Sequence, residues 1–100
     1  MLHLINNKTT GENKMNNLRK FEAEFKATFQ TAWCRVGDWD GSGDEVLWSG
    51  EDNFDANGMP LFDYYEECGY DVHPELEKIA KKHGFFFECY DAGTYIAYRL

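Results

Sequence analysis

The sequence predicts a small α+β protein in which two or three helices pack against a short antiparallel sheet. Three observations lead to this fold class. Apolar residues recur at helical spacing near the start of the chain, two strand-like segments joined by a glycine-containing turn end it, and aromatic residues fill 17% of its 100 positions. Because aromatic side chains bury large apolar areas, we expect residues 16–100 to form one core and one domain.

The first 15 residues lack the pattern of a packed element. Residues 6–13 are all polar or glycine, so we expect residues 1–15 to form a flexible N-terminal extension. The start lacks the basic and apolar regions of a signal peptide, and no segment approaches the ~20 apolar residues of a membrane span. Three widely spaced cysteines favour free thiols in a reducing compartment. We therefore expect a cytoplasmic protein without a membrane partner.

The first periodic segment predicts an amphipathic helix over about residues 17–32. Its apolar residues are spaced three or four apart, which places them on one stripe of a helix. Glu22 and Lys26 add a favourable i, i+4 pair on the opposite face. The stripe, which we interpret as core, consists of Leu18, Phe21, Phe25, Phe29 and Ala32.

Short strands and one further helix are predicted in the middle of the chain. Residues 33–36 and 46–48 are apolar segments separated by a run rich in Gly and Asp, which is typical of two strands joined by a loop. A second turn cluster occupies residues 52–58. After it, Pro60 fits the first position of a helix and Gly69 fits a left-handed stop. These positions predict a short helix over about residues 60–68.

The last third predicts a helix over about residues 74–83 and then a β-hairpin of residues 85–90 and 94–99. Pro74 fits a helix start, and Gly84 fits its end. The intervening Asp91-Ala92-Gly93 has the form of a three-residue hairpin loop, with Gly93 in a left-handed conformation.

Both faces of this hairpin carry aromatic residues, whereas a half-exposed sheet alternates apolar with polar residues. If Tyr90 pairs with Thr94, Phe86 and Tyr98 share one face and Phe85 lies on the other. Either helices cover both faces, or one face is reserved for a partner. Partial cover on both sides is the simpler interpretation.

Charge is concentrated in the middle of the chain. The net charge of the whole protein is -8, yet residues 34–71 contain one basic and eleven acidic residues. Phosphate backbones are bound by Lys and Arg, so we expect no direct binding of nucleic acid. An acidic segment instead attracts cations or basic protein surfaces.

The leading functional hypothesis is a small acidic non-enzymatic protein-interaction module, in one version an inhibitor that engages a basic surface. Aromatic residues beside the acids would anchor the partner, since Trp and Tyr are frequent interface hot spots. The predicted interaction surface consists of Asp38, Trp39, Asp40, Asp44, Glu45, Asp52, Phe54, Asp55, Tyr64, Glu66 and Glu67.

An alternative is a weak divalent-cation site in the Asp-rich loops. Residues 38–44 resemble the start of an EF-hand calcium loop, with oxygen ligands at positions 1, 3 and 5 and glycine at position 6. Glu45 and Ser49 then stand where that loop has a branched apolar residue and a bidentate glutamate. The candidate ligands for weakly bound Ca²⁺ or Mg²⁺ are Asp38, Asp40, Asp44, Asp52 and Asp55, and we expect no other cofactor.

A small hydrolase with paired carboxylates is a further alternative, because many acids are available for acid–base work. The chain contains no Gly-rich phosphate loop, no G-x-S-x-G and no H-E-x-x-H. We therefore assign no catalytic residue and favour a non-enzymatic role.

Overall fold

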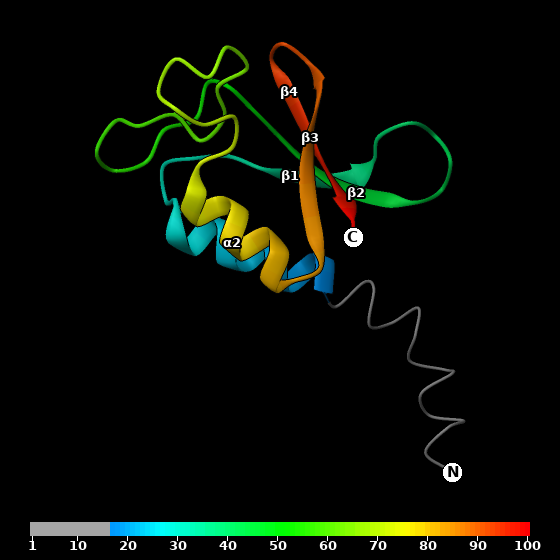
Figure 1. Cartoon of the computed structure of the whole chain (residues 1–100). Coiled ribbons are helices and arrows are strands. Elements are labelled where there is room, and N and C mark those ends of the chain that lie inside the picture. Colours follow the sequence, from blue (N-terminus) through cyan, green and yellow to red (C-terminus); the bar gives the residue numbers. More distant parts are fainter. Residues whose placement is uncertain (1–16) are drawn as a thin grey trace.

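The computed structural model describes residues 17–100 and shows helices packed against a four-stranded antiparallel sheet (Figure 1). The predicted α+β class is confirmed. The strands are β1 (Arg35–Asp38), β2 (Glu45–Gly50), β3 (Phe85–Asp91) and β4 (Thr94–Arg99), in the order β1-β2-β4-β3. The predicted extension over residues 1–15 lies outside the described residues. In the part of the chain that the structure describes, no helix has the length and apolar character needed to cross a membrane.

The N-terminal helix is helical over residues 17–28 of the described chain, which is shorter than the predicted 17–32. Its apolar stripe is buried as predicted, with Phe21 and Phe25 at the centre. Residues 29–31 form a turn in which Ala32 N donates to Phe29 O at 2.9 Å. The backbone N–H of Trp33 then donates to the side chain of Asn53. The helix therefore ends before this turn, and the tertiary hydrogen bond holds the segment that leads into β1.

The second helix, α2 (Pro74–Lys82), confirms the helix predicted over about residues 74–83. Pro74 occupies its first turn, where a missing N–H costs no helical hydrogen bond. The ring Nδ1 of His73 accepts from Glu75 N at 3.2 Å and caps the helix. Leu76, Ile79 and Ala80 are buried against the core, and Gly84 follows with a φ of 87°.

The helix predicted over about residues 60–68 is wrong. Bridges join Phe54 to Pro60 and Phe62 to Val72, so this part of the chain is extended at both ends of a turn. The carboxylate of Asp63 accepts from Tyr65 N and Cys68 N and holds that turn. An aspartate that bonds nearby backbone groups in this way competes with helix formation.

The C-terminal hairpin is confirmed, but the predicted loop conformation is not. Cys89 pairs with Tyr95, while Asp91 and not Tyr90 pairs with Thr94, which leaves a bulge at Tyr90. The turn therefore consists of Ala92 and Gly93, and Asp91 Oδ1 accepts from Gly93 N at 3.0 Å. Gly93 is not among the residues with positive φ. The bulge, rather than a left-handed glycine, accommodates the extra residue.

The core lies on one face of the sheet. Phe85 and Tyr95 project from the strands toward the N-terminal helix, where Phe21 stacks on Phe85 with ring centroids 5.3 Å apart. Segment 51–72 covers the rest of this face, and its Phe62 ring stacks on Tyr95 at 4.5 Å. In Figure 1 the helices and segment 51–72 lie on one side of the sheet, and the loop between β1 and β2 lies on the other.

Candidate functional site

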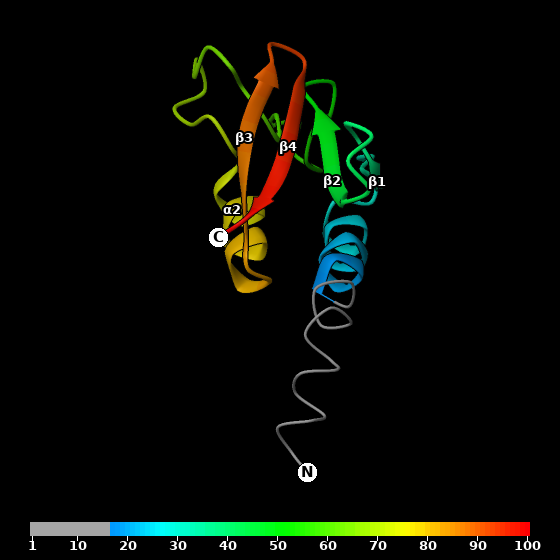
Figure 2. The same cartoon turned by 90° about the vertical axis from the view of Figure 1, so that its right-hand side faces the viewer.

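The face of the sheet turned away from the helices, which we call the helix-free face, carries its own set of aromatic residues. Figure 2 looks toward this side of the sheet. Trp48, Ile96 and Glu88 form one row across β2, β4 and β3, and Phe86 pairs with Tyr98 in the next. Ile96 is only 1% exposed although it is not part of the main core cluster. A structure other than a helix must therefore cover it.

That cover comes from the loop of residues 39–44. The ring of Trp39 contacts the ring of Trp48 at 5.0 Å and that of Tyr90 at 5.2 Å. The loop holds its own shape, because Asp38 Oδ2 accepts from Gly43 N at 2.9 Å and Asp40 Oδ1 accepts from the N–H of Ser42 at 3.0 Å. The Asp/Gly run of the sequence is thus a folded-back loop over the sheet.

Beneath the edge of this loop lies a cavity of about 210 Å³, which we call the aromatic pocket. It combines aromatic and aliphatic walls with the carboxylates of Asp40 and Asp44. Hydrogen bonds from the Ser42 hydroxyl and backbone N–H lower the pKa of Asp40, so this carboxyl is ionised at neutral pH. None of the lining residues is basic. They are Trp39, Asp40, Ser42, Asp44, Val46, Ile96 and Tyr98.

The structure divides the predicted interaction surface into two groups. The first group is Asp38, which ends β1, with Trp39, Asp40 and Asp44 of the loop that follows it. Glu45 belongs to neither group, because it begins β2 and forms an ion pair with Arg19 of the N-terminal helix at 3.6 Å. The remaining residues lie in segment 51–72, on the helix side of the sheet in Figure 1. That second group is Asp52, Phe54, Asp55, Tyr64, Glu66 and Glu67.

The candidate metal ligands are also divided. Asp52 accepts from the indole N–H of Trp33 at 2.9 Å, and Asp55 accepts from Met59 N and bonds to His73 Nε2 at 2.9 Å. The loops that carry Asp40 and Asp55 lie far apart in Figure 1. Within residues 17–100, no three His, Cys, Asp or Glu side chains are grouped so as to hold a metal ion.

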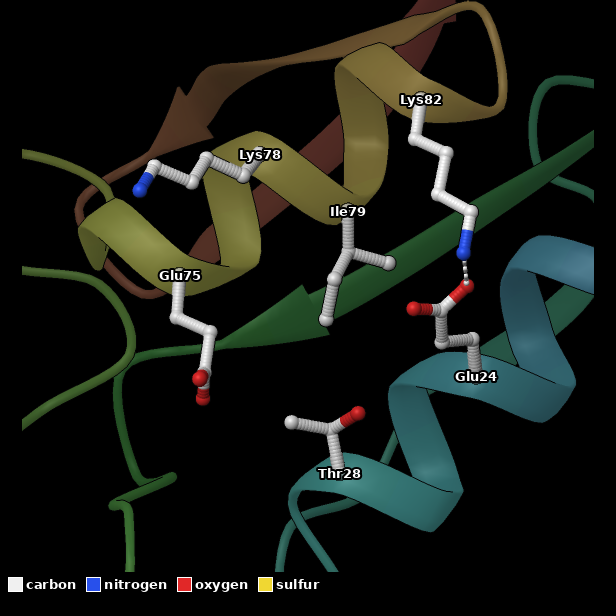
Figure 3. Close-up of a pocket in the computed structure, with 6 residues that line it drawn as sticks. All are labelled: Glu24, Thr28, Glu75, Lys78, Ile79 and Lys82. Carbon is white, nitrogen blue, oxygen red and sulfur yellow. Dashed lines mark hydrogen bonds and ion pairs between the residues drawn. The ribbon is translucent and has the colours of Figure 1, made fainter.

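A second cavity of about 280 Å³ lies between the two helices (Figure 3). Glu24 extends from the N-terminal helix toward Lys82 of α2, and its Oε1 lies 2.9 Å from Lys82 Nζ. The same oxygen lies 2.8 Å from His83 Nε2. Hydrogen bonds from His83 and Lys82 lower the pKa of Glu24. Because these charges already pair with one another, this cavity gives a weaker indication of a ligand than the aromatic pocket.

Among the described residues, the cysteines and carboxyl groups whose pKa is shifted are shifted away from the values of a nucleophile or a general acid. Burial raises the pKa of the Cys34 thiol to about 12, and burial also raises that of Cys89. A reactive cysteine needs the opposite shift. The carboxyl groups with a shifted pKa, including Asp55 and Asp63, are all shifted downward, which disfavours them as general acids.

Several residues of the helix-free face were missing from the predicted surface, among them Trp48, Tyr90, Ile96 and Tyr98. The sequence contained a signal for them, because both faces of the hairpin are aromatic. The structure contradicts the interpretation in which helices cover both faces, because a loop contacts the second face. Helices cover one face, and the other is only partly covered, with Tyr90 59% and Tyr98 39% exposed.

Compared with known proteins, the chain matches no family model, and no curated protein and no solved structure shows significant similarity to it.

Proposed function

We propose that this protein is a small acidic non-enzymatic module that binds a basic protein surface through its helix-free face. The observation that supports this function most directly is the aromatic pocket, where two carboxylates stand beside aromatic walls and no basic residue. Tyr90 and Tyr98 are exposed on the same face, and exposed apolar surface rimmed by polar residues is typical of sites that bind a partner. Carboxylates next to aromatic rings favour a partner that carries Lys or Arg.

Charge distribution supports the same proposal. Residues 34–71 carry a large excess of acids over bases, and their first loop lies over the helix-free face. Such a field raises the rate of encounter with a basic partner and weakens as salt screens it. Where the basic surface is a functional cleft of the partner protein, binding would inhibit that partner. The free thiols of Cys34, Cys68 and Cys89 support a cytoplasmic location.

The proposal is tested with oligolysine and oligoarginine as probes of a basic surface. We expect ¹H–¹⁵N shifts confined to loop 39–44 and to strands β2 and β4, with an affinity that falls as NaCl rises. The double variant Asp40→Asn/Asp44→Asn should weaken binding about tenfold. The double variant Glu66→Gln/Glu67→Gln removes the same charge from segment 51–72 and serves as the matched control.

Two results would overturn the proposal. If both double variants weakened binding equally, the probes would be attracted to net charge and not to this face. If the affinity did not change with salt, recognition would not be electrostatic. Before the probes are added, the same spectrum is titrated with Ca²⁺ and Mg²⁺ and then with EDTA. Reversible shifts of residues 38–44 at sub-millimolar metal would identify a cation-binding loop instead.

A further inference from the structure

The aromatic pocket is already formed without a ligand. Trp39 is fixed by its contacts with Trp48 and Tyr90. The ring of Trp48 in turn lies against Gly37, where an added Cβ would stand 3.3 Å from it. The buried side chain of Ile96 closes the floor. A guest therefore meets side chains that have already lost much of their rotamer freedom, which lowers the entropic cost of binding.

The pocket is amphipathic in a way that matches a long cationic side chain. Val46 and Ile96 offer aliphatic surface, Trp39 and Tyr98 offer aromatic rings, and the two carboxylates add negative charge. The carboxylate of Asp44 makes no hydrogen bond or ion pair with another side chain in residues 17–100, so it is available to a guest. Lys and Arg bury an apolar stem and keep a charged head near polar groups.

We infer that the aromatic pocket receives one arginine side chain from a basic segment of the partner protein, an inference that rests on the proposed function. Arginine fits better than lysine for two reasons. Its planar guanidinium stacks on aromatic rings, and its fork of donors meets a carboxylate with two hydrogen bonds. Trp39 and Tyr98 supply the rings, and Asp40 and Asp44 supply the acceptors.

The test uses four acetylated and amidated pentapeptides, which have glycine at every position except the third. That third residue is arginine, lysine, citrulline or norleucine. Citrulline keeps the shape of arginine without its charge, and norleucine keeps only an apolar stem. We expect the arginine peptide to shift the amides of Val46, Ile96 and Tyr98 and the indole N–H of Trp39. The citrulline peptide should bind about tenfold more weakly.

Matched variants separate the pocket from the rest of the surface. Tyr98→Leu removes an exposed ring from the wall and should weaken the arginine peptide about threefold. Tyr64→Leu removes a ring of similar exposure from segment 51–72 and should leave the affinity unchanged. Asp40→Asn should weaken the arginine peptide and leave the norleucine peptide unaffected. Circular dichroism of each variant shows whether the fold is intact.

The outcomes distinguish this inference from the proposed function. Equal binding of the lysine and arginine peptides would overturn the choice of arginine. Shifts confined to residues 51–72, or binding that is indifferent to Tyr98→Leu, would overturn the pocket as the receiving site. If oligoarginine still binds loop 39–44 while the single-arginine peptide does not, the inference fails and the proposed function stands. If neither binds, both fail.

Discussion

Asn53 connects three parts of the chain through a single buried side chain. It is 2% exposed, and its Oδ1 accepts from the N–H of Trp33 at 2.9 Å. Its Nδ2 donates to Trp33 O, to the hydroxyl of Ser49 and to Gly50 O. The end of the first helical region, strand β2 and segment 51–72 are thereby held together. A buried amide with every group paired is a strong local constraint.

Replacing Asn53 should therefore destabilise the fold. In Asn53→Ala, the N–H of Trp33 loses its side-chain acceptor and the carbonyl of Gly50 loses its side-chain donor, which costs about 2–3 kcal/mol of the free energy of unfolding. Urea denaturation followed by tryptophan fluorescence measures this change. The control is Asn57→Ala, because the side chain of Asn57 is exposed in a neighbouring turn. A loss for Asn53→Ala as small as that for Asn57→Ala would contradict the proposed role.

At the scale of elements, aspartates give segment 51–72 its shape in place of helices or strands. Asp55 accepts from Asn57 N and Met59 N, and Asp63 accepts from Tyr65 N and Cys68 N. The hydrogen bonds that Asp63 accepts lower its pKa, and the bond from the backbone N–H of Cys68 has the largest effect. Each turn therefore depends on a carboxylate that stays ionised.

The turn at residues 63–69 should loosen in acid. Because the pKa of Asp63 is lower in the folded chain, its contribution is complete above the unfolded value of about 3.9 and is lost as the pH falls through the folded pKa. The amide resonances of Tyr65 and Cys68 should titrate together with a midpoint below that of a free aspartate. Asp63→Asn should abolish this titration, whereas Glu67→Gln should leave it in place. A midpoint at or above that of a free aspartate would contradict the lowered pKa.

The end of β2 packs against the hairpin turn with no room for a side chain. A Cβ on Gly50 would stand 2.7 Å from Gly93 O and 3.0 Å from the ring of Trp33. Backbone atoms cannot give way as a flexible side chain does. The close approach lets Glu51 N donate to the same oxygen of Gly93 at 3.3 Å.

Gly50→Ala should therefore destabilise the protein by about 1–3 kcal/mol through overpacking. Gly93→Ala is the matched control, because its Cβ would meet only Asp91 Oδ1 at 3.9 Å and its φ is not positive. Thermal unfolding of both variants measures the difference. If Gly93→Ala proved as damaging as Gly50→Ala, the turn would need the left-handed glycine that the sequence suggested.

Elements with strong periodic patterns were predictable, and those shaped by tertiary hydrogen bonds were not. The Phe stripe of the N-terminal helix and the two segments of the hairpin follow local rules and were confirmed. The helix expected after Pro60 obeyed the same local rules, yet the Asp63 carboxylate and the bridge from Phe62 to Val72 overrode them. Spacing alone does not show whether a side chain such as that of Asp63 will bond the backbone of its own segment.

For the whole molecule, the acidic middle of the chain does not form one surface. Loop 39–44 covers part of one face of the sheet, and segment 51–72 covers the other (Figures 1 and 2). Asp40 and Trp39 were predictable as site residues because acids and aromatic residues were adjacent in sequence. Ile96 and Tyr98 were not assigned to the site, since they reach the pocket only through the pairing of β4 with β2.

Removal of the last strand should abolish the fold. Deleting residues 94–100 takes away Tyr95, Ile96 and Ala97, all of which are buried, and exposes the inner edges of β2 and β3. We expect no cooperative thermal transition for this truncation. Deleting residues 1–15, the predicted flexible extension, should leave the melting temperature unchanged. A cooperative transition without β4 would show that the strand order is not required.

The strand order also determines when the protein can fold during synthesis. β4 lies between β2 and β3, so the strand that is translated after the other three occupies the middle of the sheet. A nascent chain that lacks them has β2 and β3 but nothing to join them, and both helices lack part of the surface on which they pack. Folding therefore waits until β4 has emerged from the ribosome, and until then the chain exposes unpaired strands that chaperones recognise.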